Sequence, residues 1–415
     1  MNSEQTAQAT VVVTGAGLAV PGLAGPGDLL HATGGDGGFD PETGLRGRDL
    51  RHKDRATRLA LRSVESALRD AGLYGADGPA LDGTRTAVVV SSNTGNYDSV
   101  CGYVDTAARQ TSRAISAMGL PHTSTSAIAG WIASNFGLRG PAVTLCNGAT
   151  SGLDAVHWGR NLIAADRADT VVVTGVEPHN DVVQKLLGTR AVDGAATVVL
   201  ESAAHDAERA DRARAVLGVH GRGRDHHEVL CVAVGSRPED IGLWLTGDRE
   251  TDPAQRVTVG RHVALQDTLG ECGGALGVLQ CAAAVAHFDA GGDGPVLATA
   301  RTAELSLALT LLPPPGAPRL SSSERKEQNV SHNTADSVDL EELRSLMAAT
   351  FELAPEDVTD DASFTQDLGV DSLTTLEIAT RLEDRYGVDV TDEEFKSIST
   401  LLSVRELVRR KLAEA

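Results

Sequence analysis

The sequence predicts an α/β fold followed by a small all-α helix bundle. Short Val-rich runs alternate with segments of helical spacing over residues 10–312, the pattern of a mostly parallel sheet covered by helices. Only 3% of the residues are aromatic, so Ala, Gly, Val and Leu must fill a tightly packed core. The last segment has no such strand runs and repeats apolar residues at helical spacing.

The first half of the α/β segment, residues 10–203, contains the clearest elements. RATRLALRSVESALRDAGL (55–73) places Leu61, Val64, Leu68 and Ala71 on one stripe and has Gly72 as a C-terminal stop, which predicts a helix. The expected strands are TVVVTGAG (10–17), TAVVVSS (86–92), PAVTL (141–145), DTVVVTG (169–175) and AATVVLE (195–201).

A second, shorter half follows over residues 212–312. It contains four strand-like runs and the apolar segment GALGVLQCAAAVAHF (274–288), which predicts a buried helix. The four runs are RAVLGVHG, DIGLWLTG, PVLATA and LSLALTLL.

Composition divides the chain into three parts. The stretch after LPPPGAP is rich in Ser, Pro and charge and predicts a flexible linker over residues 313–337. It separates an α/β domain (10–312) from an acidic C-terminal domain (338–415). From Ser337 onward there are 19 acidic and 8 basic residues, a net charge of −11 out of −20 for the whole chain.

Charge and cysteine usage exclude several classes of function. The acidic balance argues against binding to nucleic acid or to an anionic membrane. The five cysteines form no CxxC pair, so neither a metal site nor a disulfide framework is expected, and DHHE (225–228) is interpreted as a loop. The polar N-terminus has no signal pattern, which predicts a cytoplasmic protein.

The motif DLGVDSL places Ser372 directly after Asp371 at the start of a predicted helix. Such a serine can simply cap the helix, or it can carry a phosphodiester that the helix N-terminus favours. Residues 338–415 resemble an acyl carrier protein over their whole length. The resemblance implies that a phosphopantetheinyl transferase attaches 4′-phosphopantetheine to Ser372. It also implies that acidic residues dock basic enzyme surfaces, where the alternative is a solvated helix face; these residues are Asp371, Glu377, Glu383 and Asp384.

The stretch GPAVTLCNGATSGLDAVHWG (140–159) is a strand, a small-residue turn and a helix, an arrangement that often holds a nucleophile. Residues 10–312 resemble a β-ketoacyl synthase of the thiolase fold, carried by VVVTGAGLAVPG, RHKDRATRLALRSVESALRDAGL, STSAIAGWIASNFGLRGPAVT and ATSGLDAVHWGRNLIAADRADTVVVTGVEP. The resemblance implies a layered αβαβα domain with a truncated second half. Aligned without a gap, Ala149 occupies the position of the catalytic cysteine. Cys146 is expected to be a small core cysteine on or just past the strand.

The other catalytic elements of that family are also changed. Thr246 or Gly247 stands at the first catalytic histidine, Gln266 at a lysine and Glu271 at the second histidine. A carboxylate at Glu271 would repel a developing enolate. The glycine-rich gate of the family is absent, so the resemblance implies a domain without condensing activity.

Two hypotheses of function follow. The first is a carrier and assembly subunit of a polyketide or fatty-acid synthase, similar to a chain-length factor, whose inactive domain docks an active ketosynthase or the carrier domain. Its partners would also include acyl-transfer and chain-modifying enzymes. A heterodimer is favoured over a self-dimer, with the interface expected at the strand DTVVVTG. The second is an acyl-thioester transferase or hydrolase that uses Asp248, Glu271 and Cys272.

Overall fold

The computed structural model forms two compact units, Met1–Pro318 and Arg319–Ala415. In the first unit it describes residues 10–314 except 32–38, 46–49, 51, 52, 77, 111–113, 116–118, 204–208, 210, 211, 235–240 and 248–259. In the second unit it describes residues 343, 344, 347, 348, 358–360, 362–364, 382 and 400–414. Among the described residues, no helix has the length and apolar content needed to span a membrane.

The five strands expected in the first half are all present. In the sheet they follow the order β5-β4-β6-β7-β1. Their bounds are β1 Val11–Ala19, β4 Thr86–Ser91, β5 Ala142–Leu145, β6 Thr170–Glu177 and β7 Gly194–Ser202. The β4 strand is parallel to both β5 and β6, whereas β7 is antiparallel to β6 and β1.

The second half repeats this arrangement with shorter strands. Its order, β10-β9-β11-β12-β8, matches that of the first half position by position, and β9 and β10 have only four residues each. The strands are β8 Ala215–Gly223, β9 Leu243–Thr246, β10 Arg261–Ala264, β11 Val296–Arg301 and β12 Ser306–Leu312. The halves join where β1 pairs with β8 through two residue pairs.

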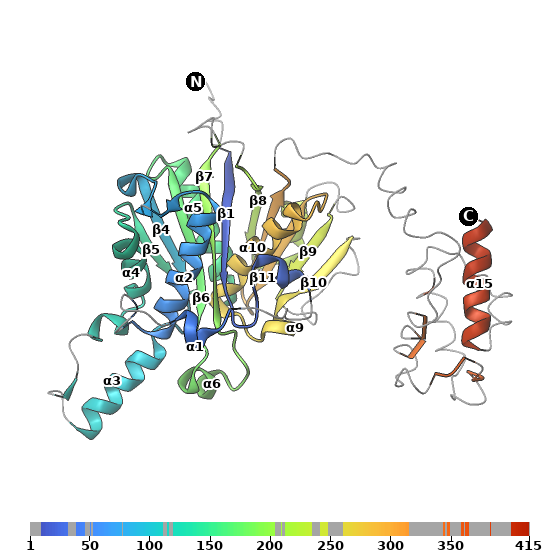
Figure 1. Ribbon diagram of the computed structural model, residues 1–415, viewed down its shortest axis with the longest axis horizontal. Helices are drawn as coiled ribbons and strands as arrows, with labels where there is room; N and C mark the ends of the chain where they lie inside the picture. Colours follow the sequence, from blue (N-terminus) through green and yellow to red (C-terminus); the bar gives the residue numbers. More distant parts are fainter. Residues whose placement is uncertain are drawn as a thin grey trace. The chain divides into compact units, whose positions relative to one another are not determined.

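Helices cover the sheet in layers, as the predicted αβαβα architecture requires (Figure 1). On one face, α2 (Arg55–Asp70) and α4 (Ala127–Phe136) bury Val88 and Val90 of β4. On the opposite face, Ala87 and Val89 of the same strand join the cluster that contains α5 (Ser151–Ala164) and α10 (Leu276–Asp289). Because both faces are buried, the strand is a continuous apolar run without alternation.

The middle layer is formed by α5 and α10, which contact each other. The α10 helix contacts β1, β6 and β7 of the first half and β11 of the second. Twelve of its side chains are buried, and all but Gln280 are apolar or glycine. This confirms the long buried helix expected from residues 274–288.

The remaining helices are short or lie outside the layers. The α8 helix (His226–Val234) packs on the outer face of β8 and β12. The α3 helix (Tyr97–Arg109) buries none of its residues and projects beyond the sheet (Figure 1). The others are α1 Pro41–Gly44, α6 Asp181–Leu187, α9 Leu265–Leu269 and, in the second unit, α15 Leu401–Glu414, with a small β2–β3 hairpin at residues 74–79.

The position of β6 contradicts the expected interface at DTVVVTG. This strand is hydrogen-bonded on both sides, to β4 and to β7, and all eight of its residues are buried. It therefore has no free edge with which to pair across a two-fold axis. Among the described strands, the free edge of the first half belongs to β5 instead, which pairs with β4 alone.

A set of polar contacts, the polar seam, joins α5 to β8. Three residues on one face of α5 each meet a residue of β8. They are Asp154 with Arg222 (3.5 Å), His157 with His220 (stacked rings, centroids 4.0 Å apart) and Arg160 with the carbonyl of Gly218 (2.7 Å). Burial, followed by the neighbouring positive groups, lowers the pKa of His220 to about 4. Burial likewise lowers the pKa of His157, so both rings are neutral at physiological pH and can stack.

Candidate functional site

The turn between β5 and α5 holds Ala149 in a fixed position. Gly148 has a φ of +77°, a left-handed conformation that glycine adopts without strain. The side chain of Asn93 brackets this residue: it accepts a hydrogen bond from the Gly148 N–H and donates one to the Gly148 carbonyl, both at 3.1 Å. The 3₁₀ turn Gly148–Thr150 then leads directly into α5.

Glu177, at the carboxyl end of β6, forms hydrogen bonds to several segments that surround the site. Its side chain is 2% exposed and accepts hydrogen bonds from the backbone N–H groups of Asn93 (2.6 Å), Thr94 (2.9 Å) and Gly274 (2.8 Å), and from the Thr94 hydroxyl. Burial raises the pKa of Glu177, and these hydrogen bonds oppose that effect. The carboxylate thus links the loop that holds Gly148 to the start of α10.

A cavity of about 130 Å³ brings together the positions that the sequence alignment singled out. It is lined by Ala149, Thr246, Gly247, Gln266 and Glu271. These residues come from the α5 turn, the end of β9, α9 and the segment before α10, so only the fold assembles them. The cavity lies at the carboxyl ends of β5, β9 and β11, where α/β sheets commonly bind ligands.

The polar groups of the cavity bond mainly to one another. Glu271 accepts hydrogen bonds from the Gly273 N–H (3.0 Å) and from Gln266 Nε2 (3.5 Å), and the Gln266 N–H donates to the Gly247 carbonyl (2.7 Å). Thr246 Oγ1 lies 2.8 Å from His262 Nε2. A carboxylate and an amide therefore line the cavity and bond to each other.

Six further residues line the cavity, and the sequence did not indicate any of them as site residues: His226, Trp244, Leu276, Thr299, Ala300 and Arg301. The interpretation of DHHE as a loop is wrong, because His226 begins α8 and the Asp225 side chain accepts the Glu228 N–H (3.0 Å). An Asp followed three residues later by Glu is a helix-start signal, so this helix could have been recognised. Among the described residues, no cluster of three or more metal-binding side chains occurs here or elsewhere.

The cysteines near the site are poor nucleophiles. Cys146 directly follows β5 and is exposed, so the prediction that it is a core residue is wrong. It is exposed because β5 is an edge strand, and no neighbouring strand covers the residues that follow it. Partial desolvation of its thiol and the charge of Glu177 nevertheless raise its pKa. Cys272 is completely buried, and burial raises its pKa well above the usual range. Both remain protonated thiols at neutral pH.

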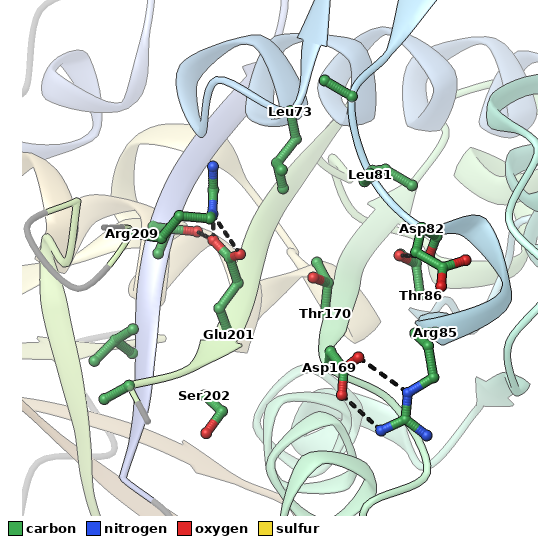
Figure 2. A pocket seen from close by; sticks show the side chains of 14 residues that line it. Leu73, Leu81, Asp82, Arg85, Thr86, Asp169, Thr170, Glu201, Ser202 and Arg209 are labelled. Atoms are coloured by element: carbon green, nitrogen blue, oxygen red, sulfur yellow. Dashed lines mark hydrogen bonds and ion pairs between the residues drawn. The ribbon is translucent and has the colours of Figure 1, made fainter. Parts of the chain in front are cut away.

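A second cavity, of about 160 Å³, lies at the opposite ends of the strands. Figure 2 shows two ion pairs across it, Arg209 with Glu201 and Arg85 with Asp169. Thr170, the first residue of β6, lies between them. Glu201 and Asp169 are each bound by an arginine, the third carboxylate, Asp82, accepts hydrogen bonds from the N–H and hydroxyl of Thr84, and none of the aligned catalytic positions lines this cavity. We therefore assign it a structural role.

The residues expected to act in the carrier domain lie outside the described residues. These are Asp371, Ser372, Glu377, Glu383 and Asp384, and Asp248 of the first unit is also outside. The described part of the second unit has its own apolar core, in which Leu343, Met347, Phe364, Leu401 and Val404 are buried. A small core of this kind, closed by the 14-residue α15, fits a compact helical carrier.

Comparison with known families assigns the two parts separately. Residues 27–192 match the family described as beta-ketoacyl synthase, N-terminal domain, and residues 341–409 match phosphopantetheine attachment site. Polyketide-8 synthase acyl carrier protein 2 of Streptomyces avermitilis is 46% identical over 81 residues, which cover 20% of this chain and 93% of that protein. The acyl carrier protein of Thermosynechococcus vestitus is 35% identical over 74 residues, 18% of this chain and 91% of that protein.

Solved structures agree on the fold of the larger part. The ishigamide ketosynthase/chain length factor superposes with a TM-score of 0.58 at 20% identity, covering 73% of this chain and 99% of that one. A type II polyketide acyl-carrier protein complex with its ketosynthase, AntDE:AntF, gives a TM-score of 0.61 at 17% identity, covering 74% and 99%.

The layered sheet and the cavity beside the α5 turn thus define a ketosynthase-like domain of thiolase-like fold. The chain belongs to the acyl carrier proteins through its C-terminal domain. It is a polyketide synthase-type, ketosynthase-like domain fused to a carrier domain whose prosthetic group is 4′-phosphopantetheine.

Proposed function

We propose that this chain is a carrier and assembly subunit of a polyketide or fatty-acid synthase and does not itself condense acyl units. The observation that carries the proposal is the cavity in which Ala149, Thr246, Gln266 and Glu271 meet. Ala149 has no lone pair with which to attack a thioester, so no acyl-enzyme can form at that position. The carboxylate of Glu271 disfavours the negative charge that decarboxylation develops.

The working chemistry then belongs to the carrier domain. In this proposal Ser372 holds the phosphopantetheine arm, whose thiol carries the acyl chain as a thioester. Asp371, Glu377, Glu383 and Asp384 attract basic surfaces of the transferase, of the acyl-transfer and chain-modifying enzymes and of a partner synthase.

Modification of Ser372 tests the carrier role. Incubation of the full chain with coenzyme A and a promiscuous phosphopantetheinyl transferase is expected to add one arm, measured by intact mass. Ser372→Ala should add none, while Ser363→Ala, a change at another serine of the same domain, should still add one. An arm retained by Ser372→Ala would contradict the assignment.

Restoring the nucleophile alone is expected to leave the domain inactive. Ala149→Cys supplies a thiol, but the neighbouring Thr246 and Glu271 cannot replace the two histidines that act on one developing charge. Incubation with malonyl-loaded carrier should therefore give no condensation product above the wild-type background, measured by mass spectrometry of the carrier-bound chains. Condensation by this single variant would show that the cavity is still competent.

The alternative, an acyl-thioester transferase or hydrolase, is not supported by a specific observation. Cys272 is fully buried and its Sγ donates to the Gly270 carbonyl (3.3 Å), so substrate cannot reach it. Glu271 remains in the cavity, where the lining hydroxyls belong to Thr246, which bonds to His262 Nε2 (2.8 Å), and to Thr299, which accepts from Trp244 Nε1 (3.0 Å). An assay of acyl-thioester turnover with Ser372→Ala distinguishes the two functions, because only the alternative predicts turnover.

Assembly with a second ketosynthase-like protomer gives the inactive domain a role. The free edge of β5 can add a strand from a partner, as sheet edges do in many complexes. The neighbouring α5 exposes Trp158 (47%), an aromatic residue of the type that anchors interfaces. We favour a heterodimer with an active ketosynthase, because a dimer of two inactive copies contains no condensing site. Co-expression with any ketosynthase encoded beside this gene, followed by light scattering, tests this assembly; a chain that stays monomeric alone and with each of them would contradict it.

A further inference from the structure

The cavity beside Ala149 lies where two strands of the second half stop pairing. The ladder between β9 and β11 ends at Leu245 and Ala298, although both strands continue beyond these residues. At this point the carbonyls of Leu245 and Thr299 accept hydrogen bonds from Nε2 of the fully buried Gln280, at 3.0 and 2.8 Å. Gln280 thus satisfies carbonyl groups where the ladder stops. The last residues of both strands line the cavity.

Apart from the imidazole of His226, two side chains of opposite charge line this cavity: Glu271, just before α10, and Arg301, at the end of β11. Glu271 accepts hydrogen bonds from the Gly273 N–H (3.0 Å) and from Gln266 Nε2 (3.5 Å), and no cation among the described residues forms an ion pair with it. Arg301 is exposed and has a partner other than Glu271. Because a guanidinium carries five N–H donors, one partner does not occupy them all. The two charges therefore share a cavity without neutralising each other.

The size and the walls of the cavity suit a small polar molecule. Its volume of about 130 Å³ corresponds to about four water molecules at about 30 Å³ each. The walls include the indole of Trp244 and the methyl group of Ala149, and the other polar side chains are those of Thr246, Gln266 and Thr299. The Thr299 hydroxyl accepts a hydrogen bond from Trp244 Nε1 (3.0 Å), so its own proton is available to an acceptor.

We propose that this cavity binds a small, free α- or β-amino acid, with the ammonium group on Glu271 and the carboxylate on Arg301. Hydrogen bonds between charged groups are about twice as strong as those between neutral groups, and here both ends of the ligand form them. The ligand is a free amino acid, because an aminoacyl thioester on the carrier arm has no carboxylate to offer Arg301. This inference goes beyond the proposed function, since it gives the non-condensing domain a small-molecule ligand of its own.

Calorimetric titration of the full chain tests the two ends of the ligand separately. The probes are glycine, alanine, serine and β-alanine, while methylamine presents the ammonium end alone and acetate the carboxylate end alone. We expect at least one of the four amino acids to bind about tenfold more tightly than methylamine or acetate, because each half-ligand lacks one charge-assisted contact. Trp244 lies in the wall of the cavity, so binding should also change the tryptophan fluorescence.

Variants of the lining assign each contact. Glu271→Gln keeps the size of the side chain and removes its charge, so it should weaken amino-acid binding by about tenfold and leave acetate binding unchanged. Arg301→Gln should weaken amino-acid binding to a similar extent and leave methylamine binding unchanged. Ala149→Leu keeps both charges but fills the cavity, and should abolish binding. Glu65→Gln is the matched control, because Glu65 pairs with Arg69 on α2 and should bind the amino acid as wild type does.

Two outcomes would overturn the proposal. One is that none of the four amino acids binds saturably, or that none binds more tightly than methylamine and acetate. The other is binding that Glu271→Gln and Ala149→Leu leave unchanged, with urea unfolding used to confirm that each variant is folded. Ser372→Ala should bind the amino acid as wild type does, because the cavity belongs to the first unit. Failure of the carrier role is therefore distinguishable from failure of this inference.

Discussion

Gly277→Ala is expected to lower the free energy of unfolding of the first unit by about 3 kcal/mol or more. Gly277 lies where α10 crosses α5. A Cβ atom there would lie 2.2 Å from the backbone N of Leu153 and 2.5 Å from the backbone C of Gly152. Backbone atoms in a packed middle layer cannot move aside as a flexible side chain can, so the two helices must separate.

Tryptophan fluorescence during urea unfolding of the full chain measures this loss. All three tryptophans, Trp131, Trp158 and Trp244, belong to the first unit, so the signal does not include the carrier domain. Gly102→Ala is the matched control: it is also a glycine inside a helix, but its Cβ would meet nothing within 4 Å. It should leave the midpoint unchanged or raise it slightly. Equal midpoints for the two variants would show that the helix crossing tolerates a methyl group.

Glu177→Ala is expected to destabilise the first unit by about 4 kcal/mol, since three buried backbone N–H groups and the Thr94 hydroxyl lose their common acceptor. Glu177→Gln keeps the shape of the side chain but turns an NH₂ group toward N–H donors. We expect this variant to lose about half as much stability as Glu177→Ala. The structural change should be largest around the cavity, because Asn93 and Gly274 are the residues whose N–H groups lose their acceptor.

The same fluorescence measurement checks this order of effects. Glu65→Gln is the control, since the side chain of Glu65 is 46% exposed and forms an i,i+4 pair with Arg69; its effect should not exceed about 0.5 kcal/mol. If Glu177→Ala unfolded with the wild-type midpoint, water would have to satisfy the released donors. Glu177 would then not be the residue that holds the site together.

Local sequence patterns were sufficient to predict most of the fold. The apolar runs indicated all five strands of the first half and four of the five in the second, β10 being missed. Helical spacing indicated α2 and α10, because burial on one stripe or on all sides leaves a trace in the residues themselves. Asp54 illustrates a boundary that sequence can locate, as its side chain accepts the Thr57 N–H (2.7 Å) at the start of α2. Alignment to a family likewise placed Ala149, Thr246, Gln266 and Glu271 before any coordinates showed that they share a cavity.

Properties that depend on strand order were predicted wrongly or not at all. Nothing in DTVVVTG distinguishes an internal strand from an edge strand, and only the pairing with β4 and β7 shows that β6 is covered while β5 is free. Cys146 is exposed for the same reason. Glu177 carried no sequence signal, because its donors come from residues 84 positions earlier and 97 positions later in the chain.

The sequence by itself determined that this protein has Val-rich strands, a buried small-residue helix, an acidic carrier segment and an alanine, Ala149, in the turn that follows the β5 run. Each of these is a property of residues that are close together in the chain. Only the tertiary structure decided which strand has a free edge, which residues surround Ala149 and that Asp154, His157 and Arg160 of α5 meet β8. Those properties arise from contacts between segments far apart in sequence, and side-chain chemistry read along the chain contains no information on such distances.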